Sequence, residues 1–541
     1  MLLDWVLLLP IFFPLVGALI LAPIAPKTPA RIRIWLPFVY LLIEIILITV
    51  NAAPGLHRLT VSEWELASFS IVLQMDAITW LLFLMTFVPL AAIWFIAAPR
   101  KPFDLLAILV LTSALLVLSA ANLITAYIAW TLLDVFIFLW RMTRNIEPET
   151  TPRSMTIGLL SGLFLFAGAI LVSTKQPNGE VLIAVAFWAR LGLFPFHHLL
   201  PTHGADPFDL WFARGIPLIA ASNLWLHWST IGRDAPVTLI GTLVVAALIA
   251  LINWIWRAIM LDSNSDSAMH VPTRAAEISL SSAFALVPLT ITLGGNAGVA
   301  LALWLTLAAV LAMALFEMAH RWRADSLNRW HRLIWFAALF ALAGLPLTPA
   351  FLGRIGLYVA LWETNNGFIM LTVGIATLIL LAPMWNIGLA LKAGELREPR
   401  RIEYAGLVLI TLVGLALSFG PTLIASALSP AVAESYERSI DLVIRTNDAL
   451  GVGLAILTLI VPVIGSYFLS HRLQRFRPRP DAMVLRLARF MDLDWLGNLS
   501  MGIGLRVAAI ARGATAIAEE NPTIWILFMA MWVAIFIMLF R

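Results

Sequence analysis

The chain has 541 residues, of which 61% are hydrophobic and 12% are charged, and its formal net charge is +4. A soluble domain has about half apolar and a quarter charged residues, so this composition indicates a membrane protein with many spans. The absence of cysteine excludes disulfides, thiolate metal sites, cysteine-ligated iron–sulfur clusters and thiol catalysis. The positive charge does not indicate nucleic-acid binding, because the basic residues lie in loops between apolar stretches.

About sixteen stretches are long and apolar enough to form transmembrane helices. They lie at 3–24, 33–53, 74–98, 103–120, 122–140, 155–173, 181–200, 208–228, 236–261, 276–293, 297–318, 331–362, 367–391, 404–427, 449–470 and 522–540. The first stretch has an acid, Asp4, where a signal peptide has basic residues, so we expect a retained span. The pattern predicts an all-α polytopic membrane protein.

Lysine and arginine gather in alternate loops, namely those that follow the odd-numbered stretches. The loop after the fifth stretch, for example, holds Arg141, Arg144 and Arg153, whereas the intervening loops have few basic residues or balance them with acids. Basic loops stay in the cytoplasm. The alternation therefore predicts that the odd-numbered loops are cytoplasmic and that the N-terminus is outside.

Two segments between the predicted spans differ from them in residue pattern. Residues 59–70 alternate and are rich in Val, Trp and Phe, which predicts a short external hairpin. Residues 471–521 begin with an Arg/Pro-rich linker and continue with two amphipathic, arginine-bearing segments at 483–490 and 503–518. These fit a helix on the membrane surface beside anionic lipid, or a lateral arm that contacts a neighbouring subunit.

The seventh and twelfth stretches are each interrupted by proline, with an arginine beside the break. Arg190 precedes Pro195, and Arg354 follows Pro346 and Pro349. A guanidinium at membrane depth must face protein or water, and a broken helix leaves backbone groups that need a polar interior. Two such sites, well separated in the chain, indicate an ion path built from repeated units.

Two histidines, His197 and His198, lie at the first break. They fit a proton relay or gate, because histidine titrates near neutral pH, or a simpler role in satisfying carbonyl groups freed at the break. A metal site is not favoured, because these residues and His203 lack the spacing of helical metal ligands. His227, between aromatic residues, is expected to be an interfacial residue of an aromatic belt.

Acidic residues also lie within or near the spans. Asp134 has apolar residues on both sides, and an intramembrane carboxylate rarely occurs without a partner, so we expect a functional role. Glu317 lies four residues before Arg321, which fits an ion pair at the cytoplasmic edge. Glu277 could pair in the same way with Arg274.

The interrupted stretches resemble those of the antiporter-like membrane subunits of respiratory complex I and of multi-subunit sodium/proton antiporters. In that family a lysine precedes a Pro-Phe-His and a Trp-Leu-Pro sequence. Here Arg190 precedes Pro195-Phe196-His197 and Leu199-Leu200-Pro201. The family's Leu-Ala-Gly-Ile-Pro segment, followed by a lysine, corresponds here to 342–346 followed by Arg354. Asp76 matches an acid that the family places after an external hairpin.

The departures from the family pattern concern titratable residues. The fifth-span glutamate is Thr131, with Asp134 one turn further on, and the eighth-span histidine falls at Gly215, beside Arg214. Both key lysines are arginines, which stay protonated and relay protons poorly. The eleventh-span histidine and lysine correspond to Ala308 and Ala312. The candidates for an ion path are Asp134, Arg190, His197, His198, Arg214 and Arg354, with Arg257, Glu277 and Glu317 as possible ion-pair partners.

The resemblance implies two inverted repeats, with discontinuous seventh and twelfth helices and Asp134 within salt-bridge range of Arg190. The expected parts are helices 1–4 at 1–120, a first repeat of helices 5–9 at 121–265, a second repeat of helices 10–13 at 266–402, helices 14–15 at 403–470, and the linker or lateral helix with the final span at 471–541.

Three functions remain open at the level of sequence. The first is an antiporter-like, non-redox membrane subunit of an NADH–quinone oxidoreductase, a membrane hydrogenase or a multi-subunit cation/proton antiporter, in a bacterial inner membrane. Its expected partners are other membrane subunits, lipid, and protons or sodium, and no cofactor or metal is expected. The second is a non-conducting structural subunit of such a complex. The third is a stand-alone anion transporter with Arg190 and Arg354 as ligands, or a membrane partner in bicarbonate uptake.

Overall fold

The structure is a computed structural model that describes the chain in separate segments. They are residues 9–11, 13–14, 16–17, 39–48, 57–64, 69–96, 105–148, 150–176, 178–193, 196, 199–201, 207–228, 283–293, 297–325, 329–390, 401–419, 437–438, 440–441, 443, 449–475, 502, 506 and 509. The chain divides into two compact units, Met1–Pro480 and Asp481–Arg541. All elements named below belong to the first unit, and most of the predicted linker and lateral helix lies outside the described residues.

The described part of the first unit is mostly helical. Its elements in chain order are β1 (His57–Trp64), β2 (Phe69–Met75), α4 (Ala77–Ile96), α5 (Leu105–Leu118), α6 (Leu123–Arg144), α7 (Thr151–Ser173), α8 (Gly179–Arg190), α9 (Pro207–Leu210), the π-helix η4 (Trp211–Gly215), α10 (Ile216–His227), α14 (Leu286–Leu293), α15 (Gly298–Asp325), α16 (Arg329–Ala343), α17 (Pro349–Glu363), α18 (Gly367–Ala390), α19 (Arg401–Phe419) and α22 (Ala449–Arg475).

Within the described residues, five helices are long and apolar enough to cross a membrane. Their spanning segments are Ala77–Phe95, Leu123–Arg144, Thr151–Ser173, Gly298–Ala319 and Leu450–Arg472, and five shorter helices are also apolar. This confirms a helical membrane architecture. The count of about sixteen spans stays a prediction, as does the relation of the two repeats. α22 continues to Arg475, so the linker predicted to begin at residue 471 begins later.

The predicted hairpin is present and somewhat longer than expected. β1 and β2 pair antiparallel, from His57 opposite Met75 to Trp64 opposite Phe69. The turn between α5 and α6 holds β2 in place, because Gln74 N–H donates to the Ser119 carbonyl (2.6 Å). The hairpin therefore binds the start of α4 to the loop that leads into α6.

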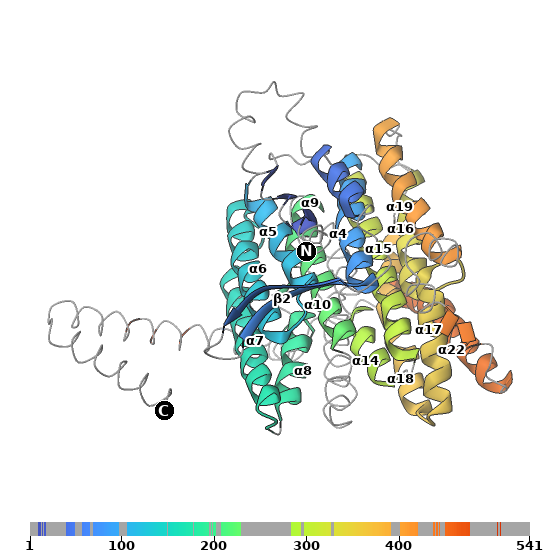
Figure 1. Cartoon of the computed structure of the whole chain (residues 1–541). Helices are drawn as coiled ribbons and strands as arrows, with labels where there is room; N and C mark the ends of the chain where they lie inside the picture. Colours follow the sequence, from blue (N-terminus) through green and yellow to red (C-terminus); the bar gives the residue numbers. More distant parts are fainter. Residues whose placement is uncertain are drawn as a thin grey trace, which may run out of the picture. The chain divides into compact units, whose positions relative to one another are not determined.

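The helices pack in a bundle around α15. α6, α7 and α8 pack side by side, as do α17, α18 and α22, and α15 contacts α4, α10, α16 and α17 (Figure 1). In the most apolar 18-residue window of Gly298–Ala319, the membrane-length part of α15, 94% of the residues are buried. A helix that is apolar on all sides and buried on all sides belongs to the centre of a bundle.

Both predicted helix breaks are present, and each has a glycine in the left-handed region. α8 ends at Arg190 and is followed by Gly192 (φ +60°), and α16 ends at Ala343 and is followed by Gly344 (φ +74°). These are the two glycines with positive φ among the described residues. Glycine adopts this conformation without the steric cost that a Cβ brings, so it suits a helix C-terminus.

Candidate functional site

The first charged pair joins α6 to the end of α8. Arg190 Nη1 donates to both carboxylate oxygens of Asp134 at 2.6 Å, and the two side chains are 1% and 9% exposed. The pairing predicted from the resemblance is thereby confirmed. Because the arginine is the last residue of α8, the pair forms at the helix break itself.

Two further contacts fix the Arg190 guanidinium. Its Nη2 donates to the Gly158 carbonyl on α7 at 2.9 Å, and its Cζ lies 4.5 Å from the centre of the Trp130 ring. A Cβ at Gly158 would lie 3.0 Å from the Asp134 Cγ, so α7 approaches this closely only with glycine there. Three helices and an aromatic face therefore hold one guanidinium in one place.

The second pair joins η4 to α15. Arg214 donates to the Glu317 carboxylate, and both side chains are 1% exposed. The sequence placed this glutamate in an edge pair with Arg321, whose side chain lies outside the described residues. The structure shows a partner on another helix, in the interior of the bundle, and the pairing with Arg321 stays a prediction. The arginine belongs to a π-helical turn, a distortion that often occurs at functional sites.

Arg354, on α17, has neutral partners. Its Nη2 donates to the Leu342 carbonyl at the end of α16 (2.9 Å), and its Nη1 donates to Thr377 Oγ1 on α18 (2.9 Å) and, more weakly, to the Tyr358 hydroxyl (3.5 Å). No carboxylate of the described residues lies within salt-bridge distance of it. This arginine therefore satisfies a backbone carbonyl that the break of the twelfth span leaves without its helical partner.

Four predicted residues lie outside the described residues. They are His197, His198, Arg257 and Glu277. Their roles as relay, gate or ion-pair partners stay predictions.

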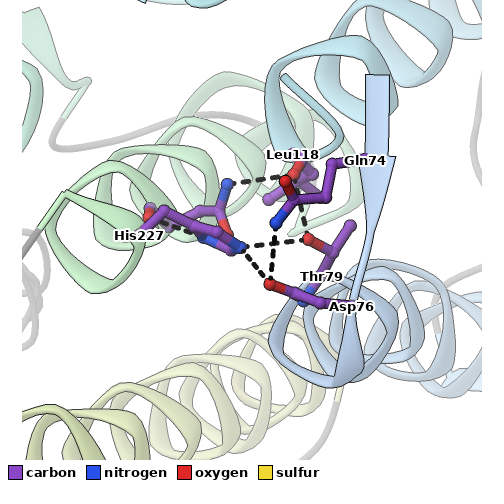
Figure 2. A network of polar contacts seen from close by, with 6 residues as sticks. Gln74, Asp76, Thr79, Leu118 and His227 are labelled. Atoms are coloured by element: carbon purple, nitrogen blue, oxygen red, sulfur yellow. Dashed lines mark hydrogen bonds and ion pairs between the residues drawn. The ribbon is translucent and has the colours of Figure 1, made fainter. Parts of the chain in front are cut away.

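A polar network that the sequence did not predict lies where β2 meets α4. Figure 2 shows the Asp76 carboxylate between His227, Thr79 and Gln74. Its Oδ2 lies 2.9 Å from His227 Nε2, and its Oδ1 accepts from the Thr79 N–H at 2.8 Å. The Gln74 amide donates to Oδ2 at 3.3 Å. The His227 ring, which also lies against the Trp228 ring, joins the end of α10 to the start of α4, and its place in an aromatic belt stays a prediction.

Charge and hydrogen bonding set the ionisation of Asp76. Burial opposes ionisation, but the hydrogen bond and the charge of His227, together with the bonds from Thr79, outweigh it and hold the pKa of Asp76 well below its usual range. The other ring nitrogen, Nδ1, lies 3.2 Å from the Asn223 carbonyl. The two ring nitrogens therefore tie His227 both to its own helix and to the Asp76 carboxylate.

No protein-family model matches the sequence, and no curated protein matches it. The fold does match solved structures. One is a chain of the Mrp complex from Dietzia sp. DQ12-45-1b, with a TM-score of 0.69 and 18% identity over 95% of this chain and 60% of that chain. Another is a chain of respiratory complex I from Thermus thermophilus with bound NADH, with a TM-score of 0.60 and 16% identity over 81% of this chain and 99% of that chain.

At these identities the likeness shows the fold alone, and the chain spans 60% of the length of the Mrp-complex chain that it matches. The predicted resemblance to antiporter-like membrane subunits is confirmed at that level. Both neighbours are chains of multi-subunit complexes, which is consistent with the expectation that this chain has other subunits as partners.

Proposed function

We propose that this chain is an antiporter-like membrane subunit of an energy-converting, multi-subunit complex, and that it supports translocation with fixed charges. The observation that carries the proposal is the Asp134–Arg190 pair at the break of the seventh span. In the resembling family this position holds a lysine, which readily changes its pKa when buried, whereas arginine does not release its proton.

The central helix α15 supports the same proposal. α15 carries no titratable side chain between Gly298 and Phe316. The positions expected to hold a histidine and a lysine are Ala308 and Ala312, and both are buried. A proton relay needs groups that gain and lose protons at hydrogen-bonding distances, and this central helix offers none over that length.

The test is Asp134→Asn in the complete complex. The variant leaves Arg190 buried without its carboxylate, a change that costs about 3–5 kcal/mol. We expect the yield of assembled complex to fall at least as much as proton or sodium flux measured in vesicles. Normal assembly combined with abolished flux would contradict the proposal and favour a working pump in this subunit.

A matched control is Asp209→Asn. Asp209 lies 3.8 Å from Arg144, a weaker contact than the 2.6 Å bonds between Asp134 and Arg190, and Arg144 keeps a second contact because its Cζ lies 4.4 Å from the centre of the Trp140 ring. This variant should assemble much better than Asp134→Asn. An equal fall in the yield of assembled complex for Asp134→Asn and Asp209→Asn would show that assembly responds to the loss of any carboxylate near α6.

The parent complex is proposed by class only. An NADH–quinone oxidoreductase, a membrane hydrogenase and a cation/proton antiporter all fit this fold. Purification of the chain from its native membrane, followed by mass spectrometry and optical spectra of the co-purified subunits, separates them. Subunits with redox centres favour the first two, and their absence favours the antiporter.

One observation favours a second candidate function. Arg354 has no carboxylate partner among the described residues, so its charge could hold an anion. The alternative is therefore a stand-alone anion transporter or a partner in bicarbonate uptake. Purification of the chain as a single species, with anion uptake that Arg354→Gln abolishes, would support it over the leading proposal.

A further inference from the structure

A third carboxylate lies buried in the described helices, and no arginine of the described residues pairs with it. Glu44 belongs to the apolar helix Val39–Ile48, near the centre of the stretch 33–53 predicted as the second span. The residue is 0% exposed. Neither carboxylate oxygen has a hydrogen-bond partner among the described residues.

The helix places Glu44 on the side that faces protein. Leu41 and Ile48 on the same face are buried, whereas Leu42 and Ile46 are about half exposed, as lipid-facing residues are. Trp80 of α4 donates its indole N–H to the Ile48 carbonyl at 2.7 Å. This bond fixes the buried face of the helix against α4.

The two described segments that are shown to contact this helix, α4 and residues 9–17, bring no charge. α4 contains no ionisable side chain. The described residues among 9–17 contain none either, and Phe13 stacks on the Tyr40 ring at a centroid distance of 5.4 Å. Tyr40, one turn before Glu44, is the titratable group of the described residues that shares its face.

An ionised carboxylate in such surroundings is very costly, and buried carboxyl groups without a partner take up a proton instead. A bound metal cation does not fit, because hard cations need about six oxygen ligands and the described surroundings offer only the Glu44 carboxylate beside one tyrosine hydroxyl. We propose that Glu44 is a proton-binding site that holds a neutral carboxylic acid within the membrane at neutral pH.

This site differs in kind from the two arginine-paired carboxylates. Asp134 and Glu317 can take up a proton only by losing an ion pair, whereas Glu44 can exchange one without breaking any contact between described residues. Of these three buried carboxylates, it is the one whose chemistry suits reversible protonation. The inference does not depend on the proposed function.

Hydrophobic carbodiimides test the inference, because they react with protonated carboxyl groups in membranes. The complete complex is treated with dicyclohexylcarbodiimide at pH 7, and the adducts are mapped by peptide mass spectrometry. We expect Glu44 to be modified at least about tenfold more than Asp134 or Glu317, the factor that one unit of pKa represents. Equal modification of the three residues, or preference for a paired one, would overturn the proposal.

Glu44→Gln provides a second test that does not depend on access of the reagent. Glutamine is close in shape to the neutral acid, so the variant should assemble as well as the wild type, in contrast to Asp134→Asn. The infrared carbonyl band of a protonated carboxyl should disappear in the variant. A band that persists unchanged, or an assembly defect like that of Asp134→Asn, would show that Glu44 is ionised and paired.

Discussion

At the scale of single residues, the buried pair of Asp134 and Arg190 restricts the protonation changes that its site allows. Both carboxylate oxygens contact one guanidinium nitrogen at 2.6 Å, and the other nitrogen binds a backbone carbonyl. The Coulomb attraction offsets the cost of burying two charges only while both are present. The pair therefore stabilises the fold, and neither residue can lose its charge without destabilising it.

We predict that removing both charges is less harmful than removing one. Asp134→Leu combined with Arg190→Met leaves no unpaired charge, so most of the loss of about 3–5 kcal/mol expected for either single variant should be recovered. The measurement is the thermal unfolding midpoint in detergent, with the yield of assembled complex. A double variant as unstable as the sum of the singles would show that the two side chains act independently.

A second residue-scale prediction concerns pH. The folded protein holds the pKa of Asp76 below its usual range, so this carboxylate stabilises the fold above the unfolded pKa of about 4, and the stabilisation is lost as the pH falls through the lower folded value. Asp76→Asn should therefore be less stable than the wild type from pH 7 down to about pH 4. Below that, the difference should shrink.

The matched control for this experiment is Gln74→Leu. It removes a neutral hydrogen-bond donor at 3.3 Å from the same carboxylate oxygen. The unfolding midpoint of Gln74→Leu should change with pH nearly as that of the wild type does. The midpoint of Asp76→Asn should deviate more from the wild-type pH dependence. A difference between Asp76→Asn and the wild type that grows on acidification would contradict the assignment of an ionised Asp76.

Single residues were predicted unevenly from the sequence, for physical reasons. The Asp134–Arg190 pair was predictable, because two charges in apolar stretches need partners and the resemblance placed their helices together. The partners of Arg214 and His227 were not predictable, because each contact joins helices whose relative rotation is set by packing. Glu44 passed unnoticed, since one acid among apolar residues shows nothing in sequence until its burial is known.

At the scale of elements, the sequence predicted where helices end better than which way each helix is rotated about its axis. Pro346 and Pro349 marked the break between α16 and α17, because proline cannot continue a helix without losing a hydrogen bond. The alternation of 59–70 correctly indicated the β1–β2 hairpin. The π-helical turn η4 was not expected, since nothing in its sequence distinguishes it from an ordinary helical turn.

The glycines at the two breaks lead to a prediction at this scale. Gly344 has φ +74°, and a Cβ there would overlap the Cδ of Arg354. Gly344→Ala should therefore cost about 1–2 kcal/mol for the left-handed backbone and about 1–3 kcal/mol for the overlap, measured as unfolding free energy. Gly453→Ala on α22 is the control, because no atom lies within 4 Å of its added Cβ. Similar losses in both variants would refute a special role for the break.

At the scale of the whole molecule, the described residues form a helical bundle with an arginine beside each of its two helix breaks. Its fold matches chains of two complexes, and the residues that we proposed for an ion path beside the two breaks, Arg190 and Arg354, are arginines, which do not release a proton. Fold and translocation activity are separable properties, because the fold depends on apolar packing and the activity depends on a few polar side chains. Under the proposed function, the subunit keeps its place in the complex while another subunit carries the ions.

The orientation of the bundle in the membrane gives the last prediction. α7 joins two exposed positions, Pro148 before it and Gln176 after it, which must lie on opposite sides if the helix spans the membrane. The basic loop before α7 is predicted to be cytoplasmic. In this cysteine-free chain, Gln176→Cys should react with an impermeant maleimide in intact cells, and Pro148→Cys should react only after the membrane is opened. The reverse pattern would invert the topology, and labelling of both from outside would show that α7 does not span.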